Sequence, residues 1–240
     1  MAAQSKSLML SLAAMYETLV ISFPTVVDGA LGRVRKDVCD ARLDSWGKKI
    51  VGHARMEVEV VGREHLVPGQ TYLVMSNHQS HYDIPVLFYV LGPNLRMITK
   101  TELFRVPIWG AAMRESGFIA IDRSNRQRAV ESLRVAQESL KSGVHIWIAP
   151  EGTRSRTGEL LPFKKGGFAL SLDAGLPILP VAIQGTRDAL RADGVRSTPG
   201  VKVKVTLFPH IEPQSYAAHG PKAAREVLAE DVRRIITSGL

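Results

Sequence analysis

The feature that most constrains the fold is one polar stretch between two apolar segments, Ser76-Asn77-His78-Gln79-Ser80-His81-Tyr82-Asp83. Residues 71–75, which precede it, are short and apolar, as is typical of a buried strand. Residues 84–91, which follow it, are also apolar and end at Gly92-Pro93, which indicates a short helix with a glycine stop. The sequence therefore predicts a polar turn between a strand and a helix, and proteins often carry reactive side chains on such turns.

The spacing of His78 and Asp83 restricts how the two side chains can meet. Along one regular helix, five positions leave two side chains about 140° apart, so the chain must change direction between them. Asp83 is followed by Pro85, as is typical of a helix N-terminus. The carboxylate could then accept a hydrogen bond from one imidazole nitrogen of His78 and raise the basicity of the other. The pair is a candidate general base with no protein nucleophile beside it.

Two other interpretations of this turn remain open. His78 and Asp83 could be an ordinary turn histidine and a helix cap. A metal site is the other alternative, because His78, His81 and Asp83 supply two imidazoles and a carboxylate. No His-Glu-x-x-His run accompanies them, and Cys39 is the only cysteine in the sequence. We therefore expect no metal ion at this position.

Length and charge narrow the class of protein. The 240 residues are enough for one large α/β domain with a sizeable core. A single cysteine excludes an intrachain disulfide framework and fits a reducing compartment. The formal charge of +8 indicates an anionic partner: a nucleic acid, an anionic membrane surface or a phosphorylated substrate. No homeodomain, zinc-finger or RNA-recognition signature is present, which disfavours a nucleic-acid-binding protein.

Residues 1–55 differ from the rest of the chain. They predict two helices within residues 5–53, the first apolar and the second amphipathic and basic on balance. Glu17, Pro24 and Asp28 interrupt the first, which makes it a poor candidate for a membrane span. We expect this pair to anchor the protein on an anionic bilayer surface. A helical hairpin packed on the domain, or an oligomer contact, is the alternative.

Residues 56–240 alternate predicted strands with predicted helices. This order favours an α/β sandwich around a single, mostly parallel or mixed sheet. The clearest helix covers residues 125–142, with Ser124 or Asn125 as its cap and Gly143 as its stop. Residues 177–183 form a strand with two prolines, so we expect that strand to be irregular or at an edge of the sheet.

Two further polar loops follow predicted strands, Asp122-Arg123 and Glu151-Gly152-Thr153-Arg154. In open α/β sheets, ligands bind at the carboxyl ends of the strands. Arg123 and Arg154 could hold a phosphate through charge-assisted hydrogen bonds, although each alone could be a surface charge. Glu151 could accept a hydrogen bond from a substrate hydroxyl, and Gly152 lets the backbone approach a ligand closely.

Four blocks of sequence, taken together, resemble the glycerolipid acyltransferase family, and within it the 1-acylglycerol-3-phosphate (lysophosphatidate) acyltransferases. In chain order they are Asn77-His78 through Asp83, Gly117-Phe118-Ile119-Ala120-Ile121-Asp122-Arg123, Pro150-Glu151-Gly152-Thr153-Arg154-Ser155, and Leu176-Pro177-Ile178-Leu179-Pro180-Val181. The resemblance covers residues 56–210. One departure is Ala149, where the family commonly has phenylalanine.

The resemblance implies transfer of a fatty acyl group from acyl-coenzyme A or acyl carrier protein to the sn-2 hydroxyl of lysophosphatidate, which forms phosphatidate. It implies that His78 is the general base, that Asp83 orients it, and that the hydroxyl attacks directly without a covalent acyl-enzyme. No cofactor is implied beyond the acyl donor. The acceptor-binding residues carried over by motif are Lys100, Arg123, Glu151, Gly152, Thr153 and Arg154.

The resemblance also implies a place for the protein in the cell. Residues 1–55 resemble the membrane-docking element of bacterial members, with residues 56–240 as the acyltransferase domain. We therefore expect a peripheral or monotopic protein on the cytoplasmic face of the bacterial inner membrane. Another acceptor, such as a lyso-ornithine lipid or a lysophospholipid, is the first alternative. A non-catalytic membrane-associated protein of the same fold is the second.

Overall fold

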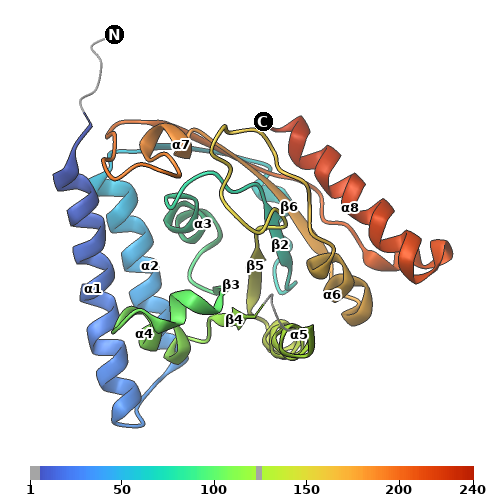
Figure 1. Cartoon of the computed structure of the whole chain (residues 1–240), viewed down its shortest axis with the longest axis horizontal. Coiled ribbons are helices and arrows are strands. Elements are labelled where there is room, and N and C mark those ends of the chain that lie inside the picture. The colour runs from blue at the N-terminus through green and yellow to red at the C-terminus, as the bar shows by residue number, and fades with distance from the viewer. Residues whose placement is uncertain (1–5, 123–125) are drawn as a thin grey trace.

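The computed structural model describes residues 6–122 and 126–240, with the side chains of residues 126–130 and 133 left out (Figure 1). Its centre is one seven-stranded sheet in the order β1-β7-β6-β2-β5-β3-β4. All neighbouring strands pair in parallel except β6 and β7, which are antiparallel. The strands are β1 (Glu57–Val61), β2 (Leu73–Ser76), β3 (Leu95–Lys100), β4 (Ile119–Ile121), β5 (His145–Ile148), β6 (Ile178–Gln184) and β7 (Lys202–Leu207).

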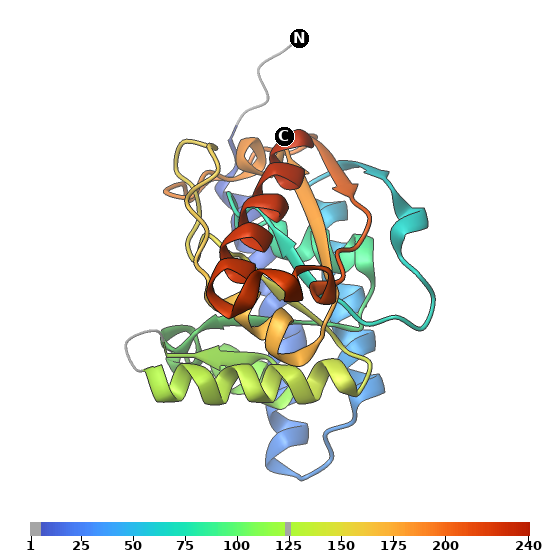
Figure 2. The same ribbon diagram turned by 90° about the vertical axis from the view of Figure 1, so that its right-hand side faces the viewer.

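Helices cover both faces of the sheet, which confirms the predicted α/β sandwich with a mixed sheet. Alternate residues of β2 point to opposite faces. Val74 belongs to the core beneath α2 and α3, whereas Leu73 and Met75 belong to the core beneath α5, α6 and α8 (Figure 2). These helices are α2 (Lys36–His53), α3 (Asp83–Leu91), α5 (Arg126–Lys141), α6 (Gly166–Ala174) and α8 (Gly220–Ser238). The strands of the sheet centre are buried on both sides, as is typical of parallel sheets.

The prediction for the proline-containing strand was wrong. β6 lies third in the sheet, between β7 and β2, and its residues from Ile178 to Ile183 are buried. Pro180 is tolerated there because it lies where the ladder with β7 ends. Its carbonyl accepts a hydrogen bond from Phe208, the first residue after β7, so the missing N–H faces the end of the neighbouring strand.

The helix predicted over residues 125–142 is present as α5, and its proposed caps, Ser124 and Asn125, lie outside the described residues. The N-terminal segment forms α1 (Leu8–Ala30) and α2, which lie side by side (Figure 1). Glu17, Pro24 and Asp28, which we expected to interrupt the first helix, all lie within α1. By length and composition alone, α1 could therefore cross a membrane.

The outer side of α1 is apolar, unlike the outer side of a surface helix in a water-soluble domain. Its buried residues are Glu17, Ser22 and Thr25. Its large exposed side chains are apolar: Leu8, Met9, Leu12, Met15, Tyr16, Leu19, Val20, Phe23 and Val27. A helix in water normally buries its apolar stripe, whereas α1 leaves much of its apolar surface exposed.

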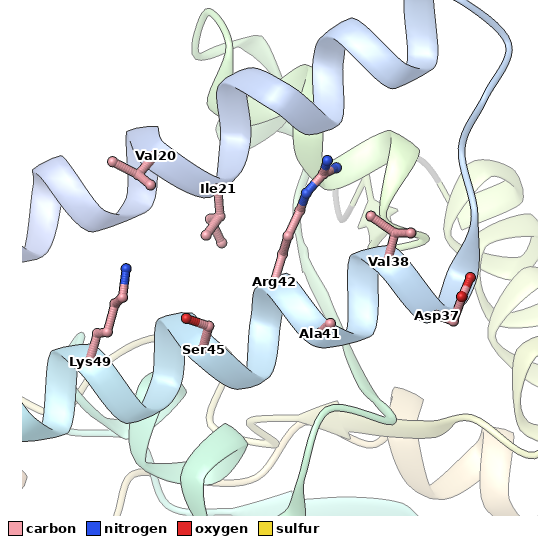
Figure 3. Close-up of a pocket in the computed structure, with 8 residues that line it drawn as sticks. All are labelled: Val20, Ile21, Asp37, Val38, Ala41, Arg42, Ser45 and Lys49. Atoms are coloured by element: carbon pink, nitrogen blue, oxygen red, sulfur yellow. The ribbon is translucent and has the colours of Figure 1, made fainter.

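Polar contacts hold α1 to α2. Glu17 lies 3.1 Å from both the Nζ atom of Lys49 and the Nε2 atom of His53. Trp46 donates a hydrogen bond to the hydroxyl of Thr18 at 3.0 Å. A shallow groove of about 470 Å³ lies between the two helices, and Figure 3 shows basic side chains of α2 pointing across it toward α1. None of the predicted site residues lines this groove.

Candidate active site

The structure brings His78 and Asp83 together at the end of β2. The chain turns after Ser76, and α3 begins at Asp83, so the change of direction occurs between the two residues. The Nδ1 atom of His78 lies 2.7 Å from the Oδ2 atom of Asp83. An ionised carboxylate only accepts hydrogen bonds, so Nδ1 carries the proton and Nε2 is left as the basic nitrogen.

Asp83 is fully buried, and every hydrogen bond it makes fixes its position. Besides His78, its Oδ2 atom accepts hydrogen bonds from the main-chain N–H groups of Gln79 at 2.8 Å and Ser80 at 2.9 Å. Its Oδ1 atom accepts one from the hydroxyl of Thr186. A buried carboxylate is stable only when its oxygens are well supplied with donors, and these four donors also set the direction in which it meets His78.

The free nitrogen of His78 is accessible. Among the described residues, Nε2 has no hydrogen-bond partner. Every buried side-chain nitrogen and oxygen of these residues does have a partner, so Nε2 must be open to solvent. Trp147 lies edge-on to the imidazole, with the ring centroids 5.3 Å apart and the planes at 84°. His78 can therefore accept a proton at Nε2 from a hydroxyl group that reaches this side of the ring.

The two serines of the turn are engaged elsewhere. Ser76 donates its hydroxyl proton to the carbonyl of Asn77 at 2.9 Å and accepts a hydrogen bond from Trp147. Ser80 donates to the carbonyl of Leu190 at 2.7 Å. Both residues are fully buried. Neither hydroxyl faces Nε2 of His78 as a nucleophile would.

The turn is bound to the end of β6. Asn77 exchanges two hydrogen bonds of 2.8 Å with the main chain of Ile183, and Gln79 donates to the same carbonyl at 2.7 Å. Thr186 follows β6 as the first residue of α7 (Thr186–Ala189), after Gly185 at a φ of 88°. A side chain at Gly185 would collide with the carbonyl of Lys202, so the close approach requires glycine.

Sequence reasoning missed Thr186 and assigned no role to Asn77 or Gln79. A signal for Thr186 was present, because it is a polar residue that follows the end of β6 after one glycine. Its partner could not be inferred, since Asp83 lies 103 positions away in the chain.

Glu151 contacts the protein itself, although we expected it to face a substrate hydroxyl. Its Oε1 atom accepts a hydrogen bond from the main-chain N–H of His78 at 2.7 Å, and its Oε2 atom accepts one from Leu161 at 2.8 Å. The side chain is 2% exposed. Burial raises the pKa of Glu151, and the hydrogen bonds from Leu161 and His78 oppose that rise. Gly152 follows at a φ of 75°, in the left-handed region.

Basic side chains gather on the same side of the sheet. The Arg154 loop is bound next to His78, because the N–H of Ser155 donates to the carbonyl of His78 at 2.8 Å. Arg154 is half-buried, and desolvation lowers its pKa. Lys100, at the end of β3, and Thr153 are exposed. Within the part of the chain that the structure describes, the charged groups of Arg154 and Lys100 have no ion pair or hydrogen bond. Arg123 lies outside the described residues.

His81 lies within this group of charges. Its pKa is lowered to about 4, first because the surrounding protein desolvates the ring and then because Arg154 and His78 are near. His81 is therefore neutral at physiological pH, and among the described residues the positive charge near the base comes from Lys100 and Arg154. Among the described residues, no group of three or more His, Cys, Asp or Glu side chains is arranged to hold a metal ion.

Comparisons with known proteins show which family the chain is similar to. A sequence model of the family described as Acyltransferase matches residues 57–184. The mouse protein 1-acyl-sn-glycerol-3-phosphate acyltransferase alpha is 33% identical over 190 residues, which cover 77% of this chain and 67% of that protein. The Saccharomyces cerevisiae protein 1-acyl-sn-glycerol-3-phosphate acyltransferase is 41% identical over 134 residues, 55% of this chain and 44% of that protein. The chain thus spans between 44% and 67% of the length of these two relatives.

A solved structure extends the similarity to almost the whole chain. The crystal structure of the 1-acyl-sn-glycerophosphate (LPA) acyltransferase PlsC from Thermotoga maritima superposes with a TM-score of 0.77 at 26% sequence identity. The match covers 97% of this chain and 94% of that one, so it includes the N-terminal helices as well as the sheet.

Proposed function

The chain belongs to the acyltransferase family, and from this premise we propose that it is a 1-acyl-sn-glycerol-3-phosphate acyltransferase. It transfers a fatty acyl group from acyl-coenzyme A or acyl carrier protein to the sn-2 hydroxyl of lysophosphatidate. The observation that carries the proposal is the hydrogen bond of 2.7 Å between His78 and buried Asp83, which leaves Nε2 accessible. The relatives described above bear the name of this activity.

In the proposed reaction, Nε2 of His78 takes the proton of the acceptor hydroxyl as the oxygen attacks the thioester carbonyl. The new C–O bond gives a tetrahedral intermediate, which collapses with cleavage of the C–S bond. The imidazolium, stabilised by Asp83, returns the proton to the leaving thiolate. A positioned base of this kind contributes about 10²–10⁴-fold to the rate. No covalent acyl-enzyme is needed, because a thiolate leaves readily and neither serine of the turn is placed to attack.

The phosphate of the acceptor is proposed to lie between Lys100, Arg123 and Arg154. Lys100 ends β3 and Arg154 follows β5, and the carboxyl ends of these strands share one edge of the sheet with His78. Neither cation makes an ion pair with another described residue. Gly152 and Thr153 complete the loop that carries Arg154. Glu151 contributes by holding this loop against the main chain of His78.

Residues 1–55 are proposed to dock the protein on an anionic membrane surface, with residues 56–240 as the catalytic domain. The support is the apolar outer side of α1, together with the burial of Glu17 against α2. Apolar side chains that enter the acyl boundary of a bilayer, and basic residues near anionic headgroups, both strengthen such binding. Docking on the cytoplasmic face would bring the active site to its lipid substrates.

The test is release of free thiol from a long-chain acyl thioester, with protein in detergent or vesicles. Both donor forms are supplied, with lysophosphatidate or with a lyso-ornithine lipid as acceptor. We expect release that depends on lysophosphatidate and is lost in His78→Ala. Release with the lyso-ornithine lipid alone would leave the proposed mechanism standing but would show that lysophosphatidate is not the acceptor. No release from folded protein with any pair of substrates would contradict the proposal.

Arg154 gives a matched test of the acceptor. Arg154→Ala should raise the KM for lysophosphatidate by about 10–100-fold, because a charge-assisted contact to the phosphate is lost. Arg156→Ala on the same loop is the control, since Arg156 is exposed and its carbonyl, not its side chain, accepts the hydrogen bonds from Arg187. Equal KM values for the two variants would contradict a phosphate contact at Arg154.

A further inference from the structure

A second apolar surface lies at the edge of the sheet that carries His78. The chain leaves β3 through a short helix, η2 (Thr101–Arg105), and turns at residues 106–108 into α4 (Trp109–Glu115). Val106 and Ile108 are each 40% exposed, and Pro107 between them is exposed as well. Three consecutive apolar residues at the tip of a turn are unusual for a surface that faces water.

The backbone of this turn is strained. Ile108 has a φ of 63° and a ψ of −62°, and the N–H of Trp109 donates to the carbonyl of Pro107 at 2.6 Å. This is a γ-turn with a positive φ, a rare conformation that is especially unfavourable for a β-branched residue. The turn leaves Ile108 40% exposed, so a large part of this residue faces away from the protein. Strained backbone of this kind is often found at functional sites.

The rest of the turn holds this conformation in place. The N–H of Gly110 donates to the carbonyl of Val106 at 2.8 Å. A side chain at Gly110 would lie 2.3 Å from the carbonyl oxygen of Phe104, so α4 packs closely against η2. The exposed tip is therefore a fixed part of the fold.

The turn lies between the candidate active site and α1. β2 and β3 both pair in parallel with β5, so their carboxyl ends share one edge of the sheet. The turn follows β3, which ends at Lys100 on the same edge of the sheet as His78. On its other side, α4 packs against α1 (Figure 1). There the side chain of Glu115 fills the space beside Gly29.

We propose that the turn formed by residues 106–108 is a second lipid-contacting element, which enters the surface of the bilayer beside α1. The inference rests on the proposed membrane docking of residues 1–55 and goes beyond it. A bilayer is the occupant because α4 holds the turn beside α1, whose exposed side chains on the face away from the protein are apolar. Arg105, which directly precedes the turn, and Lys100, at the end of β3, are both exposed and suit anionic headgroups. Lipid substrates that leave the bilayer here would directly reach the edge of the sheet at which His78 lies.

The first test places a fluorescent label on the turn. Cys39 is the only cysteine and is buried, so Cys39→Ala leaves a background with no thiol. Val106→Cys, Phe23→Cys on α1 and Val67→Cys are then labelled singly with an environment-sensitive dye. Val67 is the matched control, because it is 44% exposed and precedes β2 at the opposite edge of the sheet. Vesicles of phosphatidylcholine and phosphatidylglycerol should shift the emission of the labels at 106 and 23 to the blue and leave 67 unchanged.

The outcomes separate the two proposals. A shift at 23 without one at 106 would overturn the lipid-contacting turn and leave α1 docked. No shift at either position would overturn both. A shift at 106 that grows with protein concentration in the absence of vesicles would show contact with a second copy and also overturn the inference. Thiol release in detergent is measured in parallel, so loss of the proposed enzymatic function is recognised separately from loss of membrane contact.

The second test uses the strain itself. Ile108→Gly removes the apolar side chain and suits the positive φ, so it should raise the thermal stability of the protein. The same change should weaken binding to vesicles about fivefold, since the exposed part of one isoleucine side chain is lost from the contact. Val67→Ser should leave binding unchanged. Stronger or equal binding by the more stable Ile108→Gly variant would contradict the inference.

Discussion

The main chain of His78 is held on both sides by the loop that follows β5: its N–H donates to Glu151 at 2.7 Å, and its carbonyl accepts from Ser155 at 2.8 Å. The same loop carries Arg154 between these two residues. The proposed base and the proposed phosphate contact are therefore parts of one hydrogen-bonded unit. Movement of the loop on acceptor binding would act directly on the position of the imidazole.

Glu151→Gln tests this unit. A carboxylate accepts from both His78 and Leu161, whereas an amide offers only one oxygen, so one main-chain N–H loses its acceptor. We expect the free energy of unfolding to fall by about 1–3 kcal/mol and kcat to fall by about 10–100-fold. Chemical denaturation and steady-state kinetics measure the two effects. Glu159→Gln is the control, because Glu159 is an exposed residue of the same loop. A wild-type kcat in Glu151→Gln would contradict the claim that the loop positions His78.

Asp83→Asn tests how His78 is oriented. An asparagine side chain can present its NH₂ group to Nδ1, which would favour the tautomer that carries the proton at Nε2. That tautomer cannot accept the proton of the acceptor hydroxyl, so kcat/KM should fall by about 10³–10⁴-fold. Thermal unfolding shows whether the variant is folded. Asp188→Asn is the control and should keep full activity, because Asp188 is exposed on α7. Full activity in a folded Asp83→Asn variant would refute the proposed role of Asp83 in orienting His78.

Thr186 should act on the reaction through Asp83. Thr186→Val keeps the shape of the side chain but leaves the buried Oδ1 atom of Asp83 without its donor. We expect a loss of about 1–3 kcal/mol in stability and a fall of about tenfold in kcat. Thr186→Ser restores the hydroxyl and should restore both the stability and the rate. If Ser and Val behave alike, the hydroxyl does not position Asp83.

Glu17 should make the junction of α1 and α2 sensitive to acid. Burial opposes its charge, but hydrogen bonds from His53 and Lys49 outweigh burial, so the pKa of Glu17 is lowered from 4.5. A lowered folded-state pKa contributes stability that is present above pH 4.5 and is lost as the pH falls through the folded-state value. The difference in free energy of unfolding between wild type and Glu17→Gln should therefore shrink below pH 4.5. Glu226→Gln on α8, an exposed carboxyl, is the control, and a difference independent of pH would disprove the linkage.

Local pattern accounts for much of this fold. Short apolar runs predicted most of the strands, and the strand-to-helix turn predicted that His78 and Asp83 could meet only where the chain changes direction. Those inferences succeeded because periodicity and turn chemistry act over a few residues. The α/β class followed from the alternation of strands with helices, which depends on the order of elements along the chain and not on their contacts.

Strand order and packing decided the rest. β6 became a central strand in spite of Pro180, because the end of β7 lies opposite the missing N–H. Thr186 reaches Asp83 across 103 positions and Glu151 reaches His78 across 73, distances over which a local pattern carries no information. Likewise, composition marked α1 as apolar, but only packing against α2 showed that it buries Glu17 and turns its apolar side outward. Pairing in the sheet and burial in the core depend on which segments meet in space, and that is a property of the tertiary structure.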